Sequence, residues 1–142
     1  MRKLTLTAGT TIGALAVAIG ASTPAHAATT SGFKGFRSCG TTGAFGDYQF
    51  SNWYGPDATI NVAFSLTDTA SDGNSVRVRM ISKNVNGAVT YYQWRSNTSG
   101  YGTTSRWTTT ASNSMGLFDI GIQVARINSD GSVRNMCTSW GG

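Results

Sequence analysis

The stretch "ATINVAFSL", residues 58–66, decides the fold class. Its large apolar side chains recur at every second position: Ile60, Val62, Phe64 and Leu66. Small or polar side chains occupy the positions between them. A period of two places successive side chains on opposite faces of a β-strand. The stretch therefore predicts a half-buried strand with its apolar face against a core.

The same period recurs in both directions along the chain. In "SVRVRMISK" (75–83) apolar residues alternate with Arg77 and Arg79, and "GLFDIGIQVARI" (116–127) puts Phe118, Ile120, Ile122 and Val124 on one face. Four further stretches bring the predicted strands to about seven: "FGDYQFSNW" (45–53), "AVTYYQWR" (88–95), "TSRWTTT" (104–110) and "SVRNMCTSW" (132–140). Turn motifs such as "NVNG" (84–87) and "NSDG" (128–131) separate them. No stretch has helical periodicity, so we expect an all-β chain with a single small antiparallel β-sandwich, or alternatively a small barrel.

The N-terminal residues have the pattern of a secretory signal peptide. Arg2 and Lys3 precede an uncharged, largely apolar run, and "AHA" at 25–27 offers a cleavage site. We expect residues 1–27 to be removed and the protein to be secreted, an uncleaved anchor being the alternative. Residues 28–38 then form an N-terminal arm or a first edge strand, and residues 39–142 form the sandwich domain. No later segment is long and apolar enough to span a membrane.

The two cysteines, Cys39 and Cys137, both follow the predicted cleavage site. An isolated pair in an exported chain is most simply a disulfide. It would close a loop of about 100 residues, which chain-entropy arguments value at roughly 4–5 kcal/mol. We therefore predict a Cys39–Cys137 disulfide, with two free thiols as the alternative.

Two turns allow the pairing of strands to be predicted. If Asp130-Gly131 forms a two-residue turn, Val124 faces Cys137 and Trp140 covers Gly121, a known way to pack a strand glycine. If Asn86-Gly87 forms a similar turn, the facing pairs are Arg79 with Trp94, Ile81 with Tyr92, and Val78 with Arg95.

An aromatic and basic stretch at 77–107 supplies the candidate binding residues. They are Arg77, Arg79, Tyr92, Trp94, Tyr101, Arg106 and Trp107. One interpretation is an exposed recognition patch, with Tyr101 presented by the polar loop "SNTSGYGTT" (96–104). The other is a second packing layer, in which Arg79 stacks on Trp94 as a cation–π pair.

Composition excludes most catalytic chemistry. The only His is His26, in the predicted signal peptide, and the six acidic residues are all Asp. Neither a Ser-His-Asp triad nor a Cys/His zinc site can be built after cleavage. "DTASDGN" (68–74) lacks the regular oxygen ligands and the closing Glu of a calcium loop. We expect no enzymatic activity, no catalytic residues, no metal and no cofactor.

The charge balance bears on partners. Removing Arg2 and Lys3 changes 11 basic against 6 acidic residues to 9 against 6, a net +3. A nucleic-acid surface needs a denser positive footprint, so we expect no nucleic-acid partner.

The signal peptide together with "DTASDGNSVRVR", "WRSNTSGYGTT", "GIQVARI" and the late Cys137-x-x-Trp140 resembles small secreted β-domain proteins of actinomycetes. Some similar chains are adaptor subunits of secreted umbrella-shaped toxin particles, linking a lectin subunit to a large stalked toxin. The resemblance implies a secreted or surface protein partner and implies no site residues.

Two hypotheses of different class follow. The first is a non-enzymatic secreted adaptor or binding module that acts by protein–protein contact, through its N-terminal arm or an exposed sheet edge. The alternative is a module that binds carbohydrate or the cell envelope, which requires Trp94, Tyr101 or Trp107 to be exposed. A secreted inhibitor of a protease or glycosidase is a third possibility without a discriminating residue.

Overall fold

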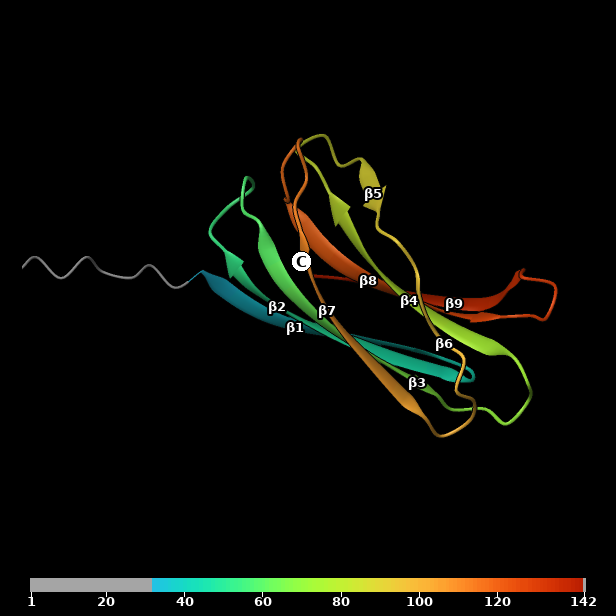
Figure 1. Cartoon of the computed structure of the whole chain (residues 1–142). Coiled ribbons are helices and arrows are strands. Elements are labelled where there is room, and N and C mark those ends of the chain that lie inside the picture. The colour runs from blue at the N-terminus through green and yellow to red at the C-terminus, as the bar shows by residue number, and fades with distance from the viewer. Residues whose placement is uncertain (1–31, 142) are drawn as a thin grey trace, which may run out of the picture.

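A computed structural model describes residues 32–141 as nine β-strands in two layers (Figure 1). The strands are β1 (Phe33–Thr41), β2 (Ala44–Trp53), β3 (Ile60–Asp68), β4 (Ser75–Lys83), β5 (Val89–Tyr91), β6 (Arg95–Asn97), β7 (Thr104–Ala111), β8 (Asp119–Ile127) and β9 (Val133–Trp140). The predicted signal peptide and the first residues of the predicted arm lie outside the described residues. Residues 33–38 lie within β1, at one edge of its sheet.

Two antiparallel sheets pack face to face, which confirms the predicted all-β sandwich. Sheet A has the order β1-β2-β3-β7. Sheet B has the order β5-β4-β8-β9, and β6 pairs with β4 beyond the end of β5. Strand β1 packs against β8 and β9, and β3 packs against β4. Within residues 32–141, no helix has the length and apolar character needed to cross a membrane.

The core lies between the sheets and follows the predicted alternation. The apolar residues of β3, Ile60, Val62, Phe64 and Leu66, are all buried, as are the inward-facing residues of β4 and β8. Phe118 is an exception, because its side chain is exposed although the sequence pattern placed it inside. Strand β8 begins only at Asp119, and the fully buried Leu117 closes the core at this end instead.

The structure has nine strands where about seven were predicted, for two reasons. Residues from Phe33 onward form β1, so the edge-strand alternative holds for the described part of the segment that was predicted as an arm or a first edge strand. The single strand predicted over 88–95 is interrupted, and its two parts are β5 and β6 along the same edge of β4.

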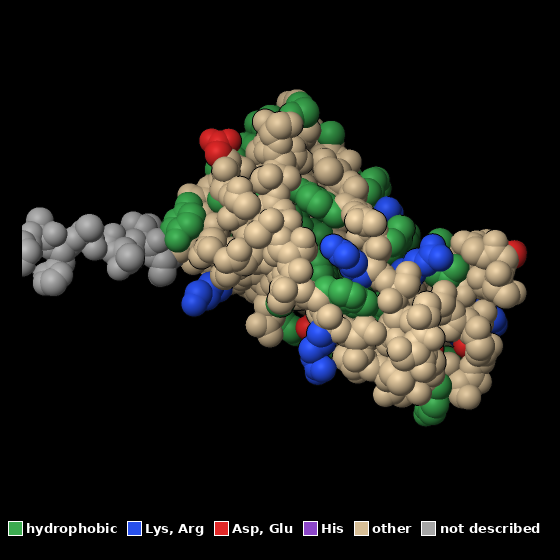
Figure 2. All heavy atoms as spheres, viewed as in Figure 1, with side chains coloured by type: hydrophobic (Ala, Val, Ile, Leu, Met, Phe, Trp, Pro, Cys, Tyr) green, Lys and Arg blue, Asp and Glu red, His purple; other side chains and the backbone are tan. Residues whose placement is uncertain are grey.

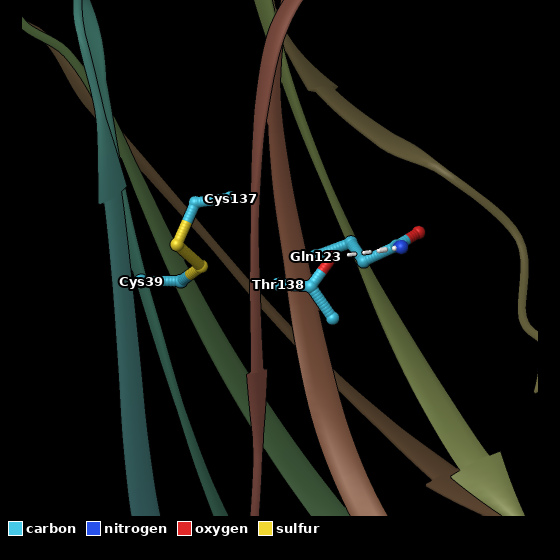
Figure 3. Close-up of a disulfide and its surroundings, with 4 residues drawn as sticks. All are labelled: Cys39, Gln123, Cys137 and Thr138. Atoms are coloured by element: carbon cyan, nitrogen blue, oxygen red, sulfur yellow. Dashed lines mark hydrogen bonds between the residues drawn. A yellow bond between two sulfur atoms is a disulfide. The ribbon is translucent and has the colours of Figure 1, made fainter.

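The disulfide joins the two sheets at one side of the sandwich. Cys39 on β1 and Cys137 on β9 are bonded, with their Cα atoms 5.8 Å apart (Figure 3). Cys137 pairs with Val124 on β8, as the predicted register required. The bridge therefore links the edge strand of sheet A to the edge strand of sheet B.

Both predicted hairpin turns have a different geometry from the two-residue turn expected. In each, the glycine N–H donates to the carbonyl of the Asn three residues earlier, from Gly87 to Asn84 and from Gly131 to Asn128, at 2.9 Å. The two glycines have φ of +76° and +85°, which favours glycine because it lacks a Cβ atom. Each turn therefore starts its hairpin one residue away from the predicted register.

The two hairpins correct this offset at different places. Between β8 and β9 a register shift at Arg126/Ile127 restores the predicted pairs, including Gly121 with Trp140. Along β4 the correction comes only between β5 and β6, so Val78 pairs with Arg95 as predicted. Ile81, however, pairs with Tyr91 instead of Tyr92, and that part of the prediction is wrong.

Candidate binding surfaces

The outer face of sheet B carries Arg79 stacked against two aromatic rings. Its guanidinium carbon lies 4.2 Å from the Trp94 ring centroid and 4.3 Å from the Tyr91 centroid. The predicted contact of Arg79 with Trp94 is therefore present. The second ring belongs to Tyr91 because the late register correction turns Tyr91, and not Tyr92, to this face. Cation–π contacts of this kind stabilise the pair by about 0.5–1 kcal/mol at exposed sites.

A chain of hydrogen bonds continues from Arg79 across the sheet. Arg79 Nε donates to Gln123 Oε1 at 2.8 Å, and Gln123 Nε2 donates to Thr138 Oγ1 at 3.0 Å (Figure 3). Burial lowers the pKa of the Arg79 guanidinium, and the neighbouring Tyr91 phenol opposes that shift. The contacts connect β5, β4, β8 and β9, so Arg79 serves as a link between strands.

Trp140 occupies the far end of the same face. An added Cβ on Gly121 would lie 2.8 Å from Trp140 Cε3, so the indole covers this glycine as predicted. Lys83 Nζ lies 4.0 Å from the Trp140 ring centroid and 2.9 Å from Asp119 Oδ2. This end of the face is likewise occupied by contacts within the protein.

The other predicted binding residues are spread over several surfaces. Arg77 lies on the outer face of sheet B, half-buried beside Arg79. Tyr92 and Trp107 pack against the core, so they do not belong to an exposed patch. Arg106 is exposed on the outer face of sheet A. The structure therefore brings Arg77, Arg79 and Trp94 together and separates the remainder of the predicted set.

Tyr101 is presented by a loop that is anchored from below. Its side chain is 64% exposed. Asn97, at 1% exposure, donates from Nδ2 to the carbonyls of Leu66 at 3.3 Å and Thr103 at 2.9 Å. These bonds hold both ends of the loop, so Asn97 has a structural role in the folded protein.

The opposite end of the sandwich exposes several hydrophobic side chains. Three loops meet there, over residues 54–59, 84–88 and 112–118. They expose four large hydrophobic side chains, which we call the apolar end: Tyr54 (60% exposed), Val85 (62%), Met115 (54%) and Phe118 (48%). Figure 2 shows a few hydrophobic side chains among neutral polar atoms at the top, where Figure 1 places the loops that follow β4 and β7.

Hydrogen bonds hold the three loops of the apolar end together. Leu117 N–H donates to the Pro56 carbonyl at 2.7 Å, and Phe118 N–H donates to the Lys83 carbonyl at 2.9 Å. Asn84 Nδ2 lies 3.5 Å from Met115 Sδ. The 112–118 loop thus bridges the other two, and the hydrophobic side chains project from a preformed scaffold.

Sequence reasoning missed the apolar end, although a signal existed. Tyr54 and Val85 each stand inside or beside a turn motif, where a large apolar residue has no core to fill. Because consecutive antiparallel strands alternate in direction, alternate loops must lie at the same end of the sheet. Together these two observations would have predicted that the loops with Tyr54 and Val85 lie at the same end of the sandwich.

The carboxylates are mostly occupied by contacts within the protein. Five of them bind a neighbouring side chain or backbone amide: Asp47, Asp68, Asp72, Asp119 and Asp130. Hydrogen bonds from Ser132 lower the pKa of Asp130, whereas a general acid at neutral pH needs a raised pKa. Within residues 32–141, no three His, Cys, Asp or Glu side chains are grouped so as to hold a metal ion.

Comparison of the chain with protein-family models, curated proteins and solved structures found no match.

Proposed function

We propose that this chain is a non-enzymatic secreted adaptor that binds a protein partner through its apolar end. The observation that carries the proposal is the exposure of Tyr54, Val85, Met115 and Phe118 on three adjoining loops. Exposed apolar side chains grouped at one end of a domain are a usual mark of a protein interaction site. Loops held by a rigid β-scaffold are where binding residues concentrate.

The construction of the apolar end favours binding. Its loops are joined by backbone hydrogen bonds and rest on the fully buried Leu117. A surface that is already ordered loses little conformational freedom on association, which improves affinity. The nearby cation, Lys83, is paired with Asp119, so its charge is already compensated when a partner covers this end.

The setting of the proposed adaptor is extracellular. The Cys39–Cys137 disulfide is compatible with an oxidising compartment, and the signal-peptide pattern agrees with it. The resemblance to toxin-particle adaptors supports membership of a secreted protein assembly, such as an antibacterial toxin particle.

The alternative, glycan binding through the predicted aromatic residues, has less support. Trp107 packs against the core, and the guanidinium of Arg79 lies over the ring of Trp94. Of the three aromatics named for that hypothesis, Tyr101 alone is classed as exposed. A single loop tyrosine makes a small platform for a sugar ring.

The test is affinity capture of partners from the culture supernatant of the organism that encodes the chain. The bait is tagged wild-type protein, compared with Met115→Ser/Phe118→Ser. We expect the wild type to capture a discrete secreted protein. The double variant should capture at least about tenfold less of it. Tyr101→Ser, an exposed aromatic at the other end of the sandwich, is the matched control and should retain the partner. Equal capture by the double variant, or no captured protein, would contradict the proposal.

A further inference from the structure

The outer face of sheet A carries a hollow of about 1010 Å³ that all four of its strands line. Six polar side chains contribute: Lys34, Gln49, Ser51, Asn61, Thr108 and Thr110. The small side chain of Ala63 keeps its floor low, and the half-exposed ring of Phe36 stands at the β1 side. No acidic residue lines it, and Lys34 is its one cation.

The polar side chains of this hollow are available to a ligand. Within residues 32–141, none of the six forms a side-chain hydrogen bond or an ion pair; Thr110 accepts a bond from Thr109 Oγ1, but through its backbone carbonyl. Elsewhere on the same face, polar side chains bind one another. Ser65 Oγ donates to Asp47 Oδ2 at 2.5 Å, and the hydroxyls of Thr67 and Thr104 are 2.7 Å apart. These four side chains are therefore engaged with one another, whereas the six of the hollow are not.

We propose that this hollow binds a neutral glycan chain. Hydroxyl and amide side chains each donate and accept hydrogen bonds, which is what sugar hydroxyl groups require of a partner. The Phe36 ring offers an apolar surface for the C–H face of a sugar. A shallow surface site lined by hydroxyl and amide side chains, with a single cation, fits an uncharged polar ligand.

The position of the hollow distinguishes a glycan from an extended peptide. A peptide strand gains affinity by pairing its backbone with a free sheet edge. The hollow lies across the face of the sheet, and its central strands β2 and β3 are paired on both sides. Only side chains are offered there, so the ligand must be recognised by hydroxyl and amide groups. A polyanion would need more than the single cation Lys34.

The test is a ¹H–¹⁵N NMR titration of the folded protein with four neutral oligosaccharides: cellohexaose, xylohexaose, mannohexaose and chitohexaose. We expect at least one to shift the amides of residues 34–36, 49–51, 61–63 and 108–110. Absence of shifts with all four would overturn the inference. So would shifts centred on Tyr101 or on Tyr91 and Trp94, or stronger binding of a neutral ten-residue peptide in the same hollow.

Two double variants on β3 and β7 give a matched comparison. Asn61 pairs with Thr110, and Thr67 pairs with Thr104, as neighbours across the same two strands. Asn61→Ala/Thr110→Ala should weaken binding of the active hexasaccharide at least about tenfold, the loss of two hydrogen bonds. Thr67→Ala/Thr104→Ala lies outside the hollow and should leave binding unchanged. Equal weakening by both variants would overturn the assignment.

The inference is independent of the proposed adaptor function. Met115→Ser/Phe118→Ser changes the apolar end, which lies outside the hollow, and should leave hexasaccharide binding unchanged. Loss of glycan binding in that variant would place the glycan at the apolar end and overturn the assignment to the hollow.

Discussion

The outer face of sheet B and the hollow on sheet A use their polar side chains in opposite ways. On sheet B, Arg79, Gln123 and Thr138 bind one another in sequence across three strands. On sheet A, the six outward-facing polar side chains of the hollow form no side-chain hydrogen bond within residues 32–141, and Thr109 Oγ1 donates only to the Thr110 carbonyl. Figure 2 shows a surface that is mostly neutral and polar, in which basic and hydrophobic side chains form small separate groups. Polarity alone therefore does not distinguish a face that stabilises the fold from one that is free to bind.

The two surfaces differ because the aromatic residues and arginines of this protein mainly have structural roles. Aromatic rings and arginines are rich in possible contacts, and in a small sandwich they find partners inside the protein first. Short hydroxyl and amide side chains on a strand reach few neighbours, so they are left for solvent or a ligand. Substitutions should therefore cost stability on sheet B and little stability on sheet A.

The largest effect is expected from Trp94→Ala. Trp94 is half-buried and stacks against Arg79, so we expect a loss of about 2–3 kcal/mol in the free energy of unfolding, somewhat below the range for a fully buried aromatic. Urea denaturation measures it. Tyr101→Ala, an exposed loop aromatic, should change stability by less than about 0.5 kcal/mol. Equal losses in the two variants would mean that the 98–103 loop is packed as firmly as sheet B.

The next largest effect is expected from Gln123→Ala, which should lower the free energy of unfolding by about 1–3 kcal/mol. The side chain is buried, and its removal leaves Arg79 Nε and Thr138 Oγ1 without their partner. Gln49→Ala is the matched control, because Gln49 faces outward on sheet A and makes no side-chain hydrogen bond within residues 32–141. Similar urea midpoints for the two alanine variants would contradict the contrast between the faces.

Much of the fold can be predicted from periodicity alone. The period of two in β3 and β4 identifies the buried faces because sheet geometry leaves a half-buried strand no other arrangement. Cys39 and Cys137 pair because the chain offers only two cysteines. The contact of Trp140 with Gly121 follows from the register of one hairpin, since the early shift at Arg126/Ile127 restores the predicted alignment.

The binding residues are harder to predict because they depend on details that periodicity does not contain. Tyr91 and Tyr92 exchange faces because the turn at Asn84–Gly87 shifts the pairing by one residue and the correction comes late. The hollow requires β7 to lie beside β3, although Ala63 and its partner Thr108 are 45 positions apart in the sequence (108 − 63). No local sequence pattern indicates that β3 and β7 are paired, so a ligand site built across sheet A has no sequence signature.

Lys83→Met should have a smaller effect and lower the free energy of unfolding by about 0.5–1 kcal/mol. It removes the partly exposed ion pair with Asp119 and the cation over the Trp140 ring, and it keeps most of the aliphatic stem. Because salt screens such pairs, the difference from wild type should shrink in unfolding experiments at high ionic strength. Lys34→Met is the control, since Lys34 has no ion pair within residues 32–141, and its stability difference should not depend on salt. A salt-independent loss at Lys83 would assign the effect to packing against Trp140.

The smallest difference in stability is expected between two double variants of threonines on the outer face of sheet A. Thr108→Ala/Thr110→Ala removes two hydroxyls of the hollow, and Thr67→Ala/Thr104→Ala removes two hydroxyls that bind each other. Both variants replace two β-branched strand residues with alanine, so the cost in β-propensity largely cancels. The Thr67/Thr104 variant should be less stable by about 0.5 kcal/mol, the value of one exposed hydrogen bond. Differential scanning calorimetry at several protein concentrations measures the difference. If the Thr108/Thr110 variant is instead the less stable one, the hydroxyls of the hollow are already engaged in the folded protein and are not free for a glycan.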